Sequence, residues 1–384
     1  MLTPRIPAVR AAVEILGEEG VGTVFGSPGA TALPWYGALE RAGGPRLLMG
    51  RHEQGATHMA DGWARTDGRT GVVVAAPEGA GRDGLFAGLR TAHADAVPLV
   101  CLTGRTTEEA PAAGLAAAAR RVTKRAVRVD DPARIPRALR EAFRTAREGR
   151  PGPVLVDLPY GTAEQYVRYD AEAEERGAPS GDGRWTAHQR DPGTAHGSRT
   201  VCRAIDEAVA ADAYVVTDAA LRRFCGARPR MTTGARRYVV CGRDGPPGWQ
   251  VPAAVGVRTA LDALGRRDTE VVALVREHEL PYAADALSVA AQHGLPFVLA
   301  AIGPDGRSGT EAVRLMRAYG CSGHRVGDPA DLRSAVAWAR KEAVTTARPA
   351  LLAVTAPTAD EGRADARAQA LVAGVPRQRT APGA

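Results

Sequence analysis

The sequence predicts an α/β protein made of two doubly wound, mostly parallel-sheet domains. Short, strongly apolar runs alternate with amphipathic helical patterns in the first part of the chain, which is typical of a parallel sheet covered on both faces. The alternation stops at a polar segment and restarts near residue 200. A chain of 384 residues has room for two domains of roughly 150 residues each.

The elements of the first domain, residues 1–168, follow from apolar spacing and breakers. Residues 8–19 carry apolar side chains at helical spacing until glycines end the pattern. A Gly-Pro turn separates the strand 23–25 from the next helix. Further strands are predicted at 47–49, 71–76, 98–103 and 153–158, with helices at 84–95 and 132–147.

Residues 169–198 are polar and rich in Glu, Gly, Pro and Ser. Such a segment cannot bury enough apolar surface to order itself, so it is predicted to be a flexible linker. The second domain then spans residues 199–357, and residues 358–384 are predicted to be a disordered tail. Its helices are expected at 200–210, 283–293, 310–319 and 330–343, and its strands at 213–217, 270–275, 296–301 and 350–355.

Composition excludes several classes of function. The net charge of +7 comes from 50 basic residues interspersed with 43 acids, and aromatic residues are only 5%, so no basic stripe for nucleic acid is expected. No apolar stretch approaches the roughly 20 residues of a membrane span, and the N-terminus lacks a signal-peptide pattern. The five cysteines form no C-x-x-C pair. We therefore expect a cytoplasmic protein without nucleic-acid or membrane partners.

Two motifs of the first domain could face a ligand. Pro28 and Gly29 follow a strand directly, at the end of the strand where open α/β sheets bind ligands; a tight βα connection is the alternative. Glu53 opens a segment rich in Gly and Ala, residues 55–64, which predicts a helix packed closely against a neighbour. Its carboxylate is expected to lie half-buried, unless it only caps that helix.

Glycine-rich loops occur in both domains. Residues 79–84, starting at Gly79, match G-x-G-x-x-G between a strand and a helix, so a nicotinamide- or flavin-binding protein is one alternative. In the second domain, Gly245 and Pro247 precede an Ala-rich helical pattern. That loop is suited to close backbone approach, although a tight turn would look similar.

Taken together, the motifs resemble thiamine-diphosphate-dependent enzymes of the acetohydroxyacid synthase and glyoxylate carboligase branch. The resemblance is dense in the first domain, which looks like the pyrimidine-binding domain of that family. The second domain looks like its diphosphate-binding domain. The matching segments are Val24–Ala30, Arg51–Ala56, His58–Gly62, Leu102–Gly104, Gly149–Pro159, Cys241–Gly256 and Val271–Phe297.

The resemblance implies cofactors, a residue role and partners. In the family, a glutamate at the position of Glu53 hydrogen-bonds the aminopyrimidine ring and favours the tautomer that deprotonates the thiazolium. It implies thiamine diphosphate and Mg²⁺ as cofactors, and a cofactor-binding set of Pro28, Gly29, Glu53, Gly79, Gly245, Pro247, Arg276 and Glu277. Family sites lie between the pyrimidine domain of one subunit and the diphosphate domain of another, which implies at least a homodimer.

The sequence departs from the family at two places. The family's middle domain is replaced by the linker, and its Gly-Asp-Gly metal motif is replaced by Arg276-Glu277-His278. Magnesium requires near-octahedral oxygen ligands, for which Glu277 and Asp305 are the candidates, while Arg276 could pair with the diphosphate directly.

The sequence thus predicts a divergent thiamine-diphosphate-dependent lyase or transferase, a carboligase or decarboxylase acting on a small 2-oxo acid. The alternative is a non-catalytic or cofactor-free relative that keeps the fold and works through a partner or a different proton transfer.

Overall fold

The computed structural model describes residues 5–105, 114–169, 204–205, 207–219, 221, 238–242, 245–303 and 308–355. Two of the expected segments, the linker beyond residue 169 and the tail 358–384, lie outside the described residues, as does Asp305. Tyr169, expected at the start of the linker, is buried and donates a hydrogen bond to Glu18 Oε1 at 2.9 Å. This residue therefore packs with the N-terminal half.

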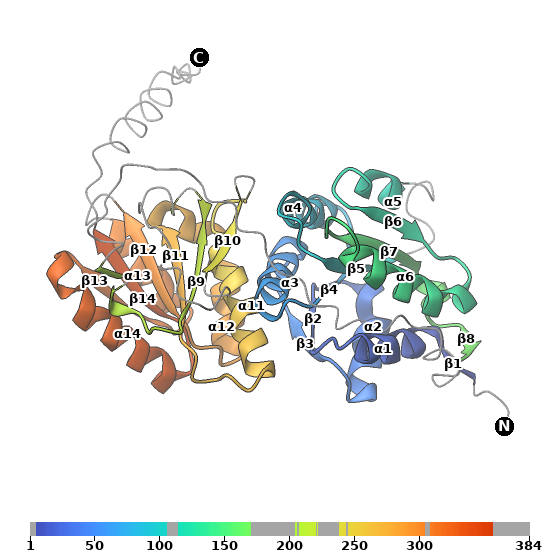
Figure 1. The fold of residues 1–384 in the computed structure, drawn as a ribbon, viewed down its shortest axis with the longest axis horizontal. Helices are drawn as coiled ribbons and strands as arrows, with labels where there is room; N and C mark the ends of the chain where they lie inside the picture. The colour runs from blue at the N-terminus through green and yellow to red at the C-terminus, as the bar shows by residue number, and fades with distance from the viewer. Residues whose placement is uncertain are drawn as a thin grey trace, which may run out of the picture.

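The N-terminal half is built on a six-stranded, fully parallel sheet (Figure 1). Its order is β3-β2-β4-β5-β7-β6. The strands are β2 (Thr23–Gly26), β3 (Arg46–Met49), β4 (Gly71–Ala75), β5 (Leu99–Arg105), β6 (Arg125–Arg128) and β7 (Val154–Pro159). The helices are α1 (Ala8–Glu18), α2 (Leu33–Ala42), α3 (Glu53–Asp67), α4 (Gly81–Ala94), α5 (Gly114–Ala119), α6 (Ile135–Arg147) and α7 (Tyr160–Ala163). A small antiparallel pair joins β1 (Arg5–Pro7) to β8 (Tyr166–Arg168).

The C-terminal half has a second six-stranded parallel sheet, in the order β10-β9-β11-β12-β14-β13. The strands are β9 (Tyr214–Asp218), β10 (Tyr238–Cys241), β11 (Val271–Arg276), β12 (Val298–Gly303), β13 (Ser322–Val326) and β14 (Ala350–Thr355). The helices are α11 (Gln250–Ala263), the 3-10 helix η3 (Glu277–Ala283), α12 (Ala284–Gln292), α13 (Ser308–Ala318) and α14 (Leu332–Thr346). The sheets confirm the predicted α/β class.

Both sheets share one topology. Numbered by appearance within each half, the strands lie in the order 2-1-3-4-6-5. The chain therefore reverses direction across the sheet between β2 and β4 in the first half, and between β9 and β11 in the second. Ligands of open α/β sheets bind outside the carboxyl ends of the strands at such switch points, so each half has one place where a ligand site is expected.

Sequence patterns missed the edge strands β6, β10 and β13 and the short pair of β1 with β8. The sequences of β6 and β13, RAVR and SGHRV, are short and only partly buried, because an edge strand needs no continuous apolar run. Part of the predicted helix 200–210, residues 200–203 and 206, lies outside the described residues. The other predicted strands and helices are present within a few residues of their expected bounds.

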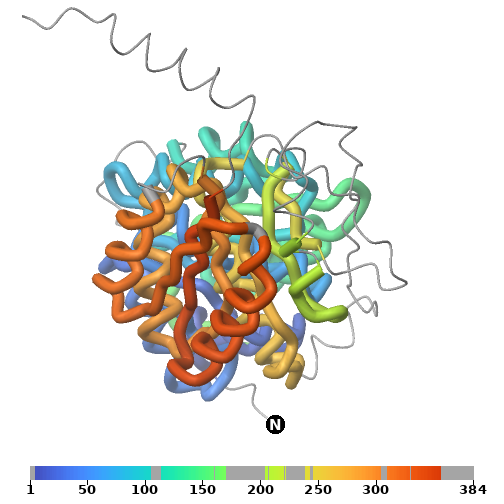
Figure 2. Tube along the Cα trace, turned by 90° about the vertical axis from the view of Figure 1, so that its left-hand side faces the viewer, coloured from blue at the N-terminus to red at the C-terminus, as the bar shows by residue number. Residues whose placement is uncertain are grey.

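The two halves pack through α3 and α11, which lie side by side at the centre of the molecule (Figure 1). Figure 2 shows the C-terminal half, in orange and red, in front of the N-terminal half, in blue and green. The helices run antiparallel, because Gly62 meets Ala253 while Gly256 meets Met59. A Cβ atom on Gly62 would lie 2.2 Å from the Ala253 carbonyl oxygen, and one on Gly256 would lie 1.9 Å from the Met59 carbonyl oxygen. The predicted close packing of the Gly- and Ala-rich helix is therefore confirmed, and its partner is α11.

We predict that Gly256→Ala lowers the free energy of unfolding by about 1–3 kcal/mol, because the added methyl group overpacks a backbone contact. The matched control is Gly17→Ala in α1, where a Cβ meets nothing within 4 Å and where Ala is favoured over Gly by up to about 1 kcal/mol. Urea denaturation measures both. Equal stability of Gly256→Ala and wild type would contradict the contact.

Candidate functional site

Glu53 lies at the switch point of the first sheet. It is the first residue of α3 and is 8% exposed, more deeply buried than the half-buried position expected from sequence. Ser27, which follows β2, donates a hydrogen bond from Oγ to Glu53 Oε1 at 3.3 Å. His52 caps the helix through Nδ1, which accepts from the Gly55 amide at 3.1 Å. Because His52 performs the capping, the Glu53 carboxylate is left for another role.

The position of the Glu53 carboxylate explains why a glycine is required in the neighbouring loop. A Cβ atom on Gly81 would lie 2.7 Å from Glu53 Oε1, so the second glycine of the G-x-G-x-x-G loop leaves room for this carboxylate. Tyr36 Oη donates to the Ser27 carbonyl oxygen, and burial raises the pKa of this phenol. Tyr36 therefore remains a protonated donor that holds the Ser27 loop.

The other predicted binding residues of this half lie in the same loops. Pro28 is exposed and Gly29 half-buried, and a Cβ on Gly29 would lie 2.1 Å from the Cβ of Ala76, just past β4. Gly79 has a φ of +52°, in the left-handed region that favours glycine. These loops thus border the Glu53 carboxylate, although no hydrogen bond joins Pro28, Gly29 or Gly79 to it among the contacts described.

A second polar cluster lies at the switch point of the second sheet. Asp218 ends β9, Arg276 ends β11, and Gln250 opens α11. Gln250 Nε2 donates to Asp218 Oδ2 at 2.7 Å, and Arg276 Nη2 lies 3.8 Å from that oxygen. Arg276 Nη2 also donates to Glu279, which is 2% exposed. Sequence reasoning missed Asp218, Gln250 and Glu279, although the Arg-x-x-Glu spacing of residues 276 and 279 signals a local ion pair.

The remaining predicted residues of this half border the same edge. Glu277 is buried, and a Cβ on Gly303 would lie 2.0 Å from its Oε2. Pro247 is exposed, while a Cβ on Gly245 would lie 2.3 Å from Cys241 Sγ. Within the described ranges, no group of three or more His, Cys, Asp or Glu side chains is arranged to hold a metal ion. Asp305, the other candidate magnesium ligand, lies outside the described residues, so the magnesium site stays a prediction.

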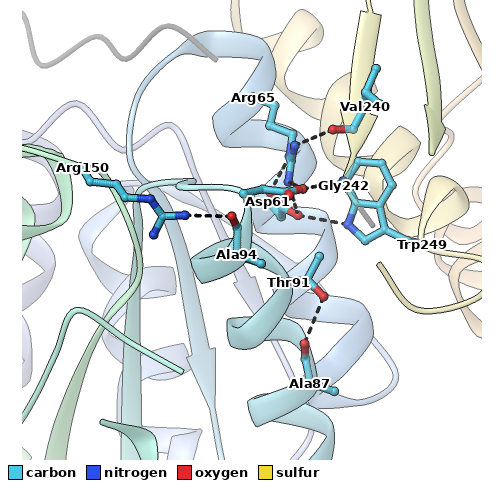
Figure 3. A network of polar contacts seen from close by, with 10 residues as sticks. Asp61, Arg65, Ala87, Thr91, Ala94, Arg150, Val240, Gly242 and Trp249 are labelled. Carbon is cyan, nitrogen blue, oxygen red and sulfur yellow. Dashed lines mark hydrogen bonds and ion pairs between the residues drawn. The ribbon is translucent and has the colours of Figure 1, made fainter. Parts of the chain in front are cut away.

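A buried ionic network fixes the loop that carries Gly245 and Pro247 (Figure 3). Arg65 donates to Asp61 Oδ1 at 2.7 Å and to Asp95 Oδ2 at 2.8 Å, and also to the Val240 carbonyl oxygen at 2.7 Å. Trp249 Nε1 donates to Asp61 Oδ2 at 3.0 Å. The Gly242 amide donates to Asp95 Oδ2 at 2.8 Å. Side chains of α3 and α4 thus hold both ends of a loop of the C-terminal half.

None of the described contacts joins Glu53 to Asp218, Gln250, Arg276 or Glu279. The start of α11, beside Gln250, lies next to Asp61 in the second half of α3, whereas Glu53 is at the other end of that helix. Eight residues of helix separate Glu53 from Asp61, which is about 12 Å at 1.5 Å per residue. Glu53 is the first residue of α3, and Gln250 is the first residue of α11. Because the two helices are antiparallel, these residues lie at opposite ends of the helix pair.

Histidines near Glu53 differ in their surroundings. His52 Nε2 lies 3.1 Å from Asp285 Oδ2 on α12, and this hydrogen-bonding carboxylate raises the pKa of His52. Arg51 reinforces the contact by donating to Ser288 and Gln292. Burial lowers the pKa of His58 to about 3, so His58 is neutral at physiological pH. His52 and Arg51 therefore connect the N-terminal end of α3 to the C-terminal half.

Part of the N-terminal half is similar in sequence to a known protein family. Residues 7–117 match the family described as "Thiamine pyrophosphate enzyme, N-terminal TPP binding domain". These residues contain Ser27, Glu53 and Gly81. This match confirms the resemblance of the N-terminal half to that family. In the part of the chain that the structure describes, no helix is long and apolar enough to span a bilayer.

Curated relatives with similar sequences include glyoxylate carboligase of Escherichia coli O157:H7, 40% identical over 178 residues, and acetolactate synthase of Arthrospira platensis, 36% identical over 174 residues. These alignments cover 44% and 43% of this chain. They span 30% of each relative's length.

Solved structures establish the fold over most of the chain. Benzoylformate decarboxylase from Polynucleobacter necessarius superposes with a TM-score of 0.72 at 15% identity, covering 93% of this chain and 99% of that one. A thiamine diphosphate-dependent 4-hydroxybenzoylformate decarboxylase from Rhodococcus jostii RHA1 gives 0.71 at 16% identity, covering 91% and 99%. Both halves of the chain therefore share the architecture of these proteins.

We predict that Arg65→Ala lowers the free energy of unfolding by about 3–5 kcal/mol, because Asp61 and Asp95 would remain buried without their cation. The control is Arg10→Ala, which removes an exposed i,i+4 pair with Glu14 and is expected to change stability by no more than about 1 kcal/mol. Chemical denaturation compares the two variants. Similar losses of stability in both variants would show that the buried network contributes no more than an exposed ion pair.

A pH prediction follows from His52. Its pKa is raised in the folded protein, so the stabilisation by Asp285 is fully present below the unfolded pKa and is lost as pH rises through the folded value. Asp285→Asn should therefore lower the melting temperature more at pH 5.5 than at pH 9. A thermal melt of both proteins at both pH values measures this. A difference that does not change with pH would rule out the ion pair.

Proposed function

We propose that this protein is a thiamine-diphosphate-dependent lyase or transferase, a carboligase or decarboxylase that acts on a small 2-oxo acid. The observation that carries the proposal is the buried Glu53 carboxylate at the switch point of the first sheet, held by Ser27 and left space by Gly81. Sequence similarity to a glyoxylate carboligase and an acetolactate synthase supports it. The same similarity favours a thiamine cofactor over the nicotinamide or flavin alternative.

The residues of the N-terminal half fit the pyrimidine end of the cofactor. A carboxylate that accepts a hydrogen bond from Ser27 through Oε1 keeps Oε2 for a ring nitrogen. Tyr36 orients the Ser27 loop from behind through the Ser27 carbonyl oxygen. Glu53 in this arrangement holds a proton at the pyrimidine, and its burial excludes the water that would compete for it. Bound thiamine diphosphate would supply a thiazolium carbanion and an electron sink.

The C-terminal half is proposed as the diphosphate end, with residues 1–168 as the pyrimidine-binding domain and 199–357 as the diphosphate-binding domain. Arg276 supplies a cation at the switch point, where the family would use Mg²⁺, and the loop with Gly245 and Pro247 lies beside it. Because a guanidinium stands at the carboxyl end of β11, we propose that Arg276 pairs with the diphosphate directly.

We propose that the complete site forms between two chains of a homodimer. The supporting observation is the antiparallel α3–α11 pair, which puts Glu53 and the Arg276 cluster of one chain at opposite ends. A second chain related by two-fold symmetry would supply the missing half to each site.

A non-catalytic relative is the second candidate, and one observation favours it. Glu279 already neutralises Arg276, and Asp218 lies 3.8 Å away, so the diphosphate end carries more negative than positive charge among these three groups. Calorimetry with thiamine diphosphate, with and without magnesium, separates the candidates. Metal-independent binding that is lost in Arg276→Ala supports the enzyme, and no binding under either condition supports the non-catalytic relative.

We predict that Glu53→Gln lowers turnover of glyoxylate or pyruvate by about 10²–10⁴-fold, the usual contribution of general acid–base catalysis, while cofactor affinity changes much less. The matched control is Glu78→Gln, the same change at an exposed glutamate of the neighbouring loop. Steady-state kinetics with added thiamine diphosphate measures turnover. Unchanged turnover in Glu53→Gln would eliminate this residue as the proton relay.

Mixing two inactive variants tests the site between chains. Glu53→Gln and Arg276→Ala, unfolded and refolded together, should form heterodimers in which one of two sites is intact. A statistical mixture would recover about a quarter of wild-type activity if sites form between chains. If each site instead forms within one chain, every site carries a substitution and the mixture stays inactive.

A further inference from the structure

Arg276 has a hydrogen-bonding capacity that no described residue satisfies. It lies at the carboxyl end of β11, the place where the strand order of the second sheet reverses. Its Nε atom is buried and has no hydrogen-bond partner in the part of the chain that the structure describes. Buried donors without partners are rare in native proteins, and each calls for an explanation. A guanidinium donates in a fixed fork that matches the oxygens of a phosphoryl group.

Glu279 occupies the other side of that guanidinium. Its carboxylate accepts from Arg276 Nη2, is 2% exposed, and leaves Oε2 buried without a partner. Asp218 is held differently, because its Oδ1 accepts from the Leu221 amide at 2.5 Å and its Oδ2 accepts from Gln250 at 2.7 Å. Of the two acids near Arg276, only Glu279 depends on the guanidinium for its described hydrogen bond.

We propose that Glu279 acts as an internal competitor for Arg276, so that the C-terminal site binds a phosphoryl anion of the diphosphate class only when this carboxylate is displaced from the guanidinium. The proposal rests on the proposed function in taking this cluster as the diphosphate end. It adds that Glu279 determines whether Arg276 is available. An anion then takes the place of the carboxylate on the guanidinium and provides an acceptor for Nε.

The experiment measures inorganic pyrophosphate binding by calorimetry, without metal or thiamine. At pH 8, Glu279→Gln should bind pyrophosphate at least about tenfold more tightly than wild type, since a charge-assisted hydrogen bond no longer competes for Arg276. The Arg276→Gln substitution, added to Glu279→Gln, should abolish the gain.

Asp262→Asn is the matched control. It removes one negative charge from a different ion pair of the same half, with Arg258, and should leave pyrophosphate affinity unchanged. A gain in Asp262→Asn equal to that in Glu279→Gln, or no gain in Glu279→Gln, overturns the proposal. Should Glu279→Gln fail to fold, Glu279→Ala takes its place, and the same gain in pyrophosphate affinity is expected. Pyrophosphate binding is measured without turnover. A protein that shows the expected affinities but has no activity would therefore refute the proposed function and leave the role of Glu279 supported.

Discussion

The contact between α3 and α11 is the constraint on which the arrangement of the molecule depends. Gly62 and Gly256 let the two backbones approach until each glycine faces a carbonyl group of the opposite helix. Packing at this distance allows one register only, because a shift along either helix would drive a side chain into the facing backbone. The relative position of the two sheets is therefore determined by two positions that carry no side chain.

The buried charges of the same interface add specificity to this packing. Asp61 and Arg65 are paired with each other and face the C-terminal half. There, Trp249 donates a hydrogen bond to Asp61, and the Val240 carbonyl oxygen accepts one from Arg65. Replacing such a network by apolar residues often costs nothing in stability, but its directional bonds accept only one partner geometry. Val240, Gly242 and Trp249 of the C-terminal half are thereby held by side chains from outside their own sheet.

Much of the fold could be predicted from sequence, but the meeting of the halves could not. Apolar runs and breakers report which residues are buried, and so they predicted most central strands and a close-packed helix after Glu53. They do not report which helix is the neighbour, because Gly and Ala fit many partners. Glu53 was found because it is a buried acid within a dense motif. Glu279 and Asp218 were missed because their importance arises only where β9 and β11 lie side by side.

The shared topology of the two sheets gives the α3–α11 contact another property. These helices follow the second strand of their respective halves, so the contact joins equivalent elements of two like units, in the manner of the self-complementary patch of a symmetric dimer. If two copies of the chain exchanged halves, α3 of one copy would pack against α11 of the other. The same contacts would form between the copies, and no new contact surface would be needed. Protein concentration and the length of chain between residues 169 and 204, rather than the chemistry of the interface, then set the balance between the single and the exchanged form.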